Sequence, residues 1–265
     1  MAVPFTKGWP TIQKRFDQAK TLLLLLDYDG TLAPIRSHPS KARLPRKTQQ
    51  VLRQLMKCKH VHLGILSGRS LRDIRKQVGL TQALYGGNHG LELRLGKKQW
   101  MEPVARRSVP FLKRLANQLS RHLRSIPGVW VENKGASLTI HWREASQKNV
   151  SKARRASLQL LAPLQKEKRI RTTYGKKVME VRPPVMWGKG KAVTAILKHG
   201  RLAKRGLLVF YAGDDLTDED AFRTVRRKRG ITVRIGLKRS TAAQYKVRSV
   251  GHFYKVLHQF SYELA

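Results

Sequence analysis

The 265-residue sequence has one cysteine, Cys58, and so cannot form an intramolecular disulfide. This scarcity fits a reducing compartment. No apolar run approaches the roughly 20 residues that a membrane helix needs, and residues 1–10 lack the apolar core of a signal peptide. We therefore expect a soluble, cytoplasmic protein that uses no membrane partner.

Acidic residues are also scarce, with 16 Asp and Glu against 55 Lys and Arg, for a formal net charge of +39. Such a field attracts polyanions. The basic residues are nevertheless spread along the chain, and the few aromatic residues do not alternate with them as a stacking platform for single strands would require. We interpret the charge as a solvated basic surface in preference to a nucleic-acid site, and polyanion binding stays open as an alternative.

The few acids gather in two places, which suggests chemistry. Seven of the 16 lie in two short segments, residues 27–29 and 214–220. The first follows an apolar run, residues 22–26, that reads as a strand buried on both faces of a parallel sheet. Ligands bind beyond the carboxyl ends of such strands. Asp27 and Asp29 would repel each other there, so we expect a hard metal ion to hold them.

The pattern along the chain predicts a doubly wound α/β core interrupted by an insert. Strands at 61–66 and 83–85 alternate with helices at 46–57 and 70–78. Residues 91–184 change to hairpin-like strand pairs separated by helices, which predicts an inserted α/β domain within a core of residues 1–90 and 185–265. After the insert, the alternation of strands and helices continues with a helix at 190–199 and an apolar strand at 207–212.

Three predicted strands are followed directly by polar residues, and if the strands are parallel neighbours, these residues would meet in one crevice. The three segments are Asp27 with Asp29, Ser67-Gly68-Arg69, and Gly213-Asp214-Asp215. Together with Lys189, which opens a helix in a glycine-rich turn, they are the parts that phosphoryl transfer needs. No P-loop motif is present.

The two leading acids suit different roles. Asp27 continues the rigid strand and is the predicted nucleophile, which would form an aspartyl-phosphate. Asp29 stands one step into the loop and is the predicted acid/base. A Mg²⁺ ion bridging Asp27, the Asp29 backbone carbonyl and Asp214 would keep Asp27 ionised, with Lys189 neutralising phosphate from the other side.

Each of these motifs, taken alone, also has a structural interpretation that involves no catalytic role. Ser-Gly is a common turn, and Lys189 is one of many basic residues. Glu219 and Asp220 are interpreted as acids that favour a helix N-terminus, whereas Asp218 is interpreted as functional. His141 is interpreted as structural, and His89 as either a structural residue or a substrate contact.

Taken in order, the motifs resemble a known family. Asp-Tyr-Asp-Gly-Thr-Leu, Ser-Gly-Arg, the lysine before Gly190, and Gly-Asp-Asp-Leu-Thr-Asp-Glu-Asp-Ala-Phe resemble the four motifs of haloacid dehalogenase-type phosphatases. The first and last are similar to those of trehalose-6-phosphate phosphatases. Segments 132–138, 141–143, 175–176 and 180–183 resemble the cap motifs of that family. The resemblance covers about residues 22–235.

The resemblance implies a Rossmann-like parallel-sheet core with an inserted α+β cap, Mg²⁺ dependence, and hydrolysis of trehalose 6-phosphate. The site residues follow from the matched motifs. Catalytic residues are Asp27, Asp29 and Lys189; phosphate-binding residues are Thr31, Ser67, Gly68 and Lys189; metal ligands are Asp27, Asp29, Asp214 and Asp218; and substrate-binding residues are Arg69, Glu132, Lys134, Arg143, Lys176 and Glu180.

Three alternatives stay open at this point. A related phosphatase would act on sucrose 6-phosphate or mannosyl-3-phosphoglycerate. A basic polyanion-binding protein could use the same fold, and would show affinity that falls steeply with salt.

Overall fold

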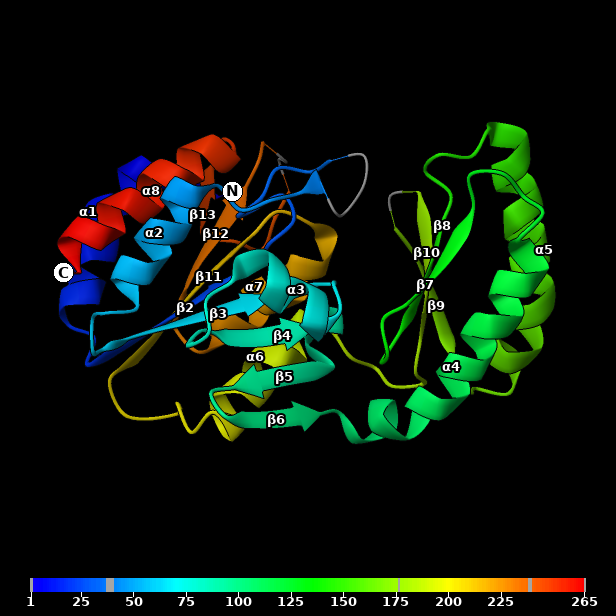
Figure 1. Ribbon diagram of the computed structural model, residues 1–265. Coiled ribbons are helices and arrows are strands. Elements are labelled where there is room, and N and C mark those ends of the chain that lie inside the picture. The colour runs from blue at the N-terminus through cyan, green and yellow to red at the C-terminus, as the bar shows by residue number, and fades with distance from the viewer. Residues whose placement is uncertain (1, 37–40, 176, 238–239, 265) are drawn as a thin grey trace. The chain divides into compact units, whose positions relative to one another are not determined.

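The computed structural model describes residues 2–36, 41–175, 177–237 and 240–264. The chain forms two compact units, one of residues 1–100 and 187–265 and one of residues 101–186. Each unit has its own sheet and its own core. Figure 1 shows the two sheets with the helices that cover them.

The first unit is a doubly wound sheet, which confirms the predicted fold class. Within the described residues its strand order is β1-β13-β12-β11-β2-β3-β4-β5-β6. In this spatial order, every neighbouring pair from β1 through β13, β12, β11, β2 and β3 to β4 is parallel. Strands β4 and β5 are antiparallel. The strands are β1 (Val3–Pro4), β2 (Thr21–Leu26), β3 (Val61–Leu66), β4 (Leu84–Gly87), β5 (Glu92–Leu95), β6 (Lys98–Met101), β11 (Leu207–Gly213), β12 (Ile231–Ile235) and β13 (Tyr245–Val247).

Helices cover both faces of this sheet. They are α1 (Phe5–Asp17), α2 (Arg46–Leu55), α3 (Leu71–Val78), α6 (Lys189–His199), α7 (Glu219–Arg227) and α8 (Val250–Glu263), with short 3-10 turns η2 (Asn88–Gly90) and η3 (Leu216–Asp218). The leucines of β2 alternate between two cores. Leu22, Leu24 and Leu26 pack on one side, and Leu23 and Leu25 on the other. All five are fully buried, because a central parallel strand has no solvent face.

The second unit is a four-stranded antiparallel sheet backed by two long helices. The strand order is β7-β8-β10-β9, with β7 (Trp130–Asn133), β8 (Leu138–His141), β10 (Val178–Arg182) and β9 (Arg171–Gly175). The helices are α4 (Pro103–Leu123) and α5 (Gln147–Lys166). They pack on the sheet through Leu112, Leu119, Leu161, Ile140 and Met179, among others.

The division between the units differs from the expected boundaries at 91 and 184. Strands β5 and β6 extend the large sheet, so residues 92–100 belong to the first unit. Pairing decides this, because Gly86 and Gly87 of β4 align with Leu93 and Glu92 of β5. The change from parallel to antiparallel pairing occurs inside one sheet, and the sequence pattern alone does not show that.

Candidate active site

The site lies where β2, β3 and β11 end. These strands are parallel neighbours, with Leu26 aligned to Ala212 on one side and to Ile65 on the other. Asp27 therefore follows the central strand, while Ser67 and Asp214 follow the flanking ones. The topology thus confirms the adjacency that the sequence predicted.

Lys189 is the buried cation of this site. It opens α6, has 2% of its surface exposed, and donates from Nζ to Asp27 Oδ1 at 2.6 Å and to Asp218 Oδ1 at 2.7 Å. Although burial acts to lower its pKa, the two carboxylates outweigh that and raise the pKa of Lys189. The ammonium is therefore charged at any physiological pH.

Asp218 organises the end of β11. Its Oδ1 also accepts a hydrogen bond from Tyr211 Oη at 2.7 Å, and its Oδ2 accepts from the backbone N–H groups of Asp214 and Asp215 at 3.0 and 2.9 Å. This fully buried carboxylate fixes the turn that carries Asp214. Sequence reasoning missed Tyr211, because it sits within an apolar strand and only its contact with Asp218 distinguishes it.

Three carboxylates converge on one point that could hold a metal ion. Ligand oxygens of Asp27, Asp214 and Asp218 lie within 4.8 Å of one another. Within the described part of the chain, Asp27 Oδ2 and Asp214 Oδ1 are buried without a hydrogen-bond partner. Burial, followed by the charge of Asp218, raises the pKa of Asp214 to about 7, and burial likewise raises the pKa of Asp27 despite Lys189. Crowded acceptors of this kind fit a hard cation with oxygen ligands.

Gly30 lets the first loop approach the third strand. Its φ is +90°, and a Cβ added there would lie 2.1 Å from Asp214 Oδ2. Only glycine combines this backbone conformation with so close an approach. The glycine of the Asp-Tyr-Asp-Gly-Thr motif therefore brings the Asp27 loop against Asp214.

Asp29, the second acid of the Asp-Tyr-Asp motif, lies in a different environment from Asp27. Asp29 is held by Arg69, whose Nε and Nη2 donate to its two oxygens at 2.7 Å each. Arg69 also donates to Asp73 Oδ2 at 2.7 Å and lies over the Tyr28 ring. Its guanidinium therefore contacts protein carboxylates in this structure, and its expected contact with substrate stays a prediction. The Asp29 carboxylate, which is 40% exposed, lies outside the three-carboxylate cluster of the described residues.

The expected phosphate-binding residues lie in the same two loops. Thr31 is fully buried, and its Oγ1 has no partner among the described residues. Ser67 Oγ accepts a hydrogen bond from the Arg69 N–H at 3.2 Å. Gly68 gives room to the His89 ring, because an added Cβ would lie 2.7 Å from it. The His89 ring therefore lies against the predicted phosphate-binding loop, and both interpretations of His89 stay predictions.

Glu219 and Asp220 do more than favour the N-terminus of their own helix. Asp220 Oδ2 accepts from the Gly190 N–H at 2.9 Å, which ties α7 to the turn that carries Lys189. Glu219 accepts hydrogen bonds from Arg234, Thr241 and the Ala242 N–H. Both contacts depend on elements that only the fold brings near, so the sequence-based interpretation was too narrow.

The predicted sugar-binding residues of the second unit lie on one face of its sheet. Glu132 Oε2 contacts His141 Nε2 at 2.9 Å, and the His141 ring stacks on Trp130 with centroids 3.8 Å apart. Glu180 pairs with Lys134 at 3.7 Å and with Arg182.

The two remaining residues of that set are less informative. Arg143 follows β8 and is half-buried. Lys176 lies outside the described residues.

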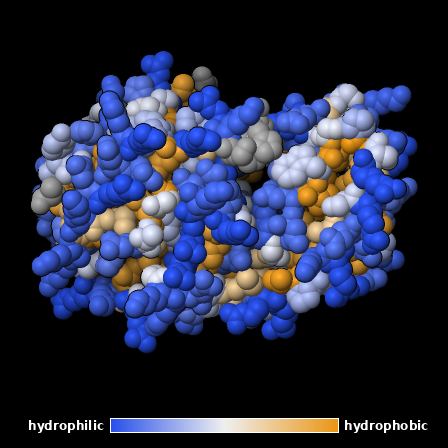
Figure 2. All heavy atoms as spheres, viewed as in Figure 1, coloured by the Kyte–Doolittle hydropathy of each residue, from blue (hydrophilic) through white to orange (hydrophobic). Residues whose placement is uncertain are grey.

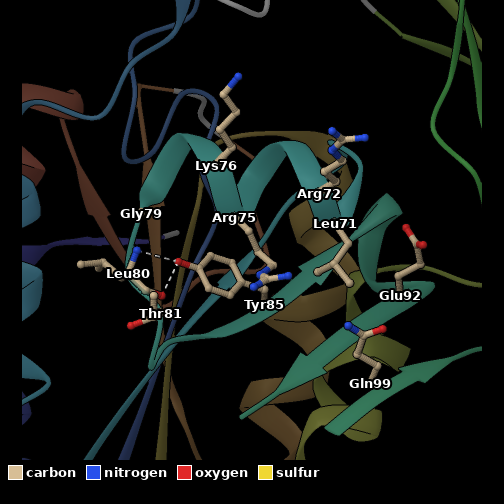
Figure 3. A pocket seen from close by; sticks show the side chains of 10 residues that line it. All are labelled: Leu71, Arg72, Arg75, Lys76, Gly79, Leu80, Thr81, Tyr85, Glu92 and Gln99. Carbon is tan, nitrogen blue, oxygen red and sulfur yellow. Dashed lines mark hydrogen bonds between the residues drawn. The ribbon is translucent and has the colours of Figure 1, made fainter. Parts of the chain in front are cut away.

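A separate pocket of about 500 Å³ lies beside α3 in the first unit (Figure 3). Leu71, Leu80 and Tyr85 form its apolar part, and Arg72 and Lys76 extend away from the sheet on the same helix. None of the residues assigned to phosphate or metal lines it, so this pocket is not the candidate active site. Among the described residues, every helix is too short or too polar to cross a bilayer.

Comparisons with known proteins agree with this geometry. The family model described as trehalose-phosphatase matches residues 25–251. Probable trehalose-phosphate phosphatase H of Arabidopsis thaliana is 30% identical over 246 residues, which are 87% of this chain and 69% of that protein. The trehalose-phosphate phosphatase of Mycobacterium avium is 36% identical over 207 residues, 77% of this chain and 51% of that one.

A solved structure shows the same fold. The C-terminal domain of the C. albicans trehalose-6-phosphate phosphatase superposes with a TM-score of 0.78 at 25% identity, over 95% of this chain and 96% of that chain. The match extends across both units, since it covers almost the whole chain.

Proposed function

The chain belongs to the trehalose-phosphatase family, and from that premise we propose that it hydrolyses trehalose 6-phosphate to trehalose and phosphate through an aspartyl-phosphate. The observation that carries this proposal is the buried Lys189 bridging Asp27 and Asp218, with the second oxygen of Asp27 left without a partner among the described residues. Lys189 anchors one oxygen, so the other is the one that can attack phosphorus.

The proposed first step forms a bond between Asp27 Oδ2 and phosphorus while the bond from phosphorus to the sugar oxygen breaks. Asp29 donates a proton to that leaving oxygen. Arg69 donates one hydrogen bond to each oxygen of Asp29, and the second lone pair of either oxygen can carry the proton. Arg69 thus fixes the orientation of the Asp29 carboxyl group both when it donates a proton and when it accepts one.

The proposed second step is hydrolysis of the aspartyl-phosphate. Water attacks phosphorus, Asp29 takes its proton, and the bond from phosphorus to Asp27 breaks to release phosphate. The buried Thr31 hydroxyl, the Ser67 hydroxyl and Lys189 would hold the phosphate oxygens during both steps. Asp27, Asp214 and Asp218 with the Asp29 backbone carbonyl would hold Mg²⁺, which when bound neutralises phosphate charge and keeps the carboxylates ionised.

For sugar selection we propose the polar face of the second unit's sheet. Glu132, Glu180 and Lys134 already form ion pairs or hydrogen bonds there, so their side chains are oriented before substrate arrives. Such preorganisation suits recognition of sugar hydroxyls by paired donors and acceptors. Arg143, Lys176 and Arg69 are proposed as further substrate contacts.

The test is a phosphate-release assay on trehalose 6-phosphate, sucrose 6-phosphate, mannosyl-3-phosphoglycerate and glucose 6-phosphate, with Mg²⁺ and with EDTA. We expect release from trehalose 6-phosphate to be fastest and to require Mg²⁺. Asp27→Asn should lower that rate by at least about 10³-fold, because the amide is no nucleophile, while circular dichroism stays unchanged. Equal rates on all four substrates would contradict the trehalose assignment, and an active Asp27→Asn would contradict the mechanism.

A further inference from the structure

The two helices of the second unit form a basic surface that the proposed function does not use. Helices α4 and α5 each carry five Lys or Arg residues and no Asp or Glu. All ten of these side chains are exposed. We call them the α4–α5 basic layer: Arg106, Arg107, Lys113, Arg114, Arg121, Lys148, Lys152, Arg154, Arg155 and Lys166.

This layer faces away from the proposed sugar-binding residues. Leu138, Ile140, Met179 and Val181 of the sheet point toward the helices and form the core with them. Alternation along a strand turns Glu180 to the opposite face. The layer therefore contains none of the acidic residues of that face. Its side chains are also not among the proposed sugar-binding residues. Figure 2 shows many hydrophilic side chains over these helices, at the right of the view.

The kind of partner follows from what the layer offers besides charge. Phe111 is the one aromatic residue of the two helices, which are fully described, and Arg169 covers its ring at 4.4 Å. The nearby Tyr174 is likewise covered by Arg154 at 5.2 Å. Unstacked bases of a single strand would find no open ring there. Leu158 is the one large apolar side chain exposed on these two helices, so the layer has no wedge for insertion into a membrane.

From these observations we propose that the α4–α5 basic layer binds the phosphate backbone of duplex nucleic acid without reading its sequence. Each helix has about 20 residues and is therefore roughly 30 Å long, which is close to one turn of a duplex. Ten cations over that length can replace the counterions condensed on both strands. The net charge of +39 adds long-range attraction to the same partner.

The experiment measures binding of a fluorescent DNA duplex of about 20 base pairs and arbitrary sequence, by anisotropy, from about 50 to 300 mM NaCl. The layer variant replaces Lys113, Arg114, Lys148, Lys152 and Arg155 with Gln. The control variant replaces five exposed cations on helices of the first unit, Lys14, Lys47, Arg53, Lys198 and Lys255, with Gln. Both variants lose the same net charge, and none of these residues has a proposed catalytic role.

We expect the wild-type chain to bind with an affinity that falls steeply with salt. The layer variant should bind at least about tenfold more weakly at 100 mM NaCl, and its slope of log Kd against log salt should fall by about 3–4. The control variant should lose less than about threefold. Melting temperature and phosphate release should match wild type in both variants, which separates this test from that of the proposed function.

Two results would overturn the proposal. Equal losses in the two variants would assign the binding to net charge alone. Stronger binding to phosphatidylserine-containing vesicles than to the duplex, lost in the layer variant, would make a membrane surface the partner.

Discussion

Arg69 donates two parallel hydrogen bonds of 2.7 Å to Asp29, one from Nε and one from Nη2. This fork places the proposed acid/base in a single orientation, and Asp73 holds the guanidinium from its other end. The serine-glycine-arginine motif therefore does more than follow a strand. It carries the residue that positions the second acid of the first motif.

Replacing Arg69 with Lys should separate positioning from simple charge. The lysine keeps one positive charge but cannot form the fork, so Asp29 loses its fixed orientation. We expect kcat to fall on the order of 10–100-fold with a smaller change in KM. Steady-state kinetics on trehalose 6-phosphate check this, with Asp73→Asn as a milder companion. A rise in KM beside the fall in kcat would fit the further contact with substrate that we propose for Arg69, whereas an unchanged kcat would contradict its positioning role.

Replacing Lys189 with Met should destabilise the fold as well as stop catalysis. Asp27 and Asp218 would then be buried without their shared cation, and a broken buried pair costs about 3–5 kcal/mol. Urea unfolding in EDTA measures this free energy. Lys198→Met, at an exposed position on the same helix, is the control and should change it by less than about 0.5 kcal/mol. Equal stability of the two variants would contradict the buried ion-pair network.

Gly30→Ala should disturb the metal site through Asp214. The new Cβ would lie 2.1 Å from Asp214 Oδ2, so that carboxylate has to move. We expect loss of most of the Mg²⁺-induced rise in melting temperature and a comparable loss of activity. Gly96→Ala is the matched control, because Gly96 also has positive φ but nothing lies within 4 Å of its added Cβ. It should cost only the backbone strain of about 1–2 kcal/mol and leave the Mg²⁺ effect intact.

Stability should depend on pH through Asp214 in the absence of metal. Its pKa is raised from 3.8 to about 7, so its contribution to folding is present below about pH 4 and is lost as pH rises through 7. In EDTA, Asp214→Asn should therefore gain stability over wild type between pH 4 and pH 8, on the order of 1–3 kcal/mol.

Mg²⁺ should reverse that difference, because it favours the ionised carboxylate. Urea unfolding of both proteins at several pH values, with EDTA or Mg²⁺, measures it. A difference that does not change with pH would show that Asp214 is ionised throughout in the folded state.

Glu180→Gln should weaken sugar binding. It removes the charge that holds Lys134 and Arg182, so those donors lose their fixed positions. We expect KM for trehalose 6-phosphate to rise at least about fivefold with kcat changed less, as for contacts made equally in the ground and transition states. Glu167→Gln removes an exposed ion pair with Arg169 in the same unit and should leave KM unchanged. A fall in kcat without a change in KM would argue against the proposed role.

Local sequence patterns predicted the elements that have local causes. The buried strand before Asp27 and the helix after Ser70 came from an apolar run and a capping residue. Helix α1 was not predicted, because Gly8 and Pro10 interrupt its pattern. Strands β1 and β13 were not predicted either, because they are only two and three residues long and β1 pairs with β13 from the other end of the chain.

The sequence by itself determined which chemistry is present: carboxylates, a hydroxyl and a lysine, each at the end of a strand or the start of a helix. Their order and spacing are local properties, so the family could be identified without the fold. The tertiary structure decided how these groups are paired. Lys189 meets Asp27 across 162 positions of the chain, and Arg69 meets Asp29 across 40. Such contacts depend on which strands are neighbours, and strand order is set by burial of the whole core rather than by any short segment.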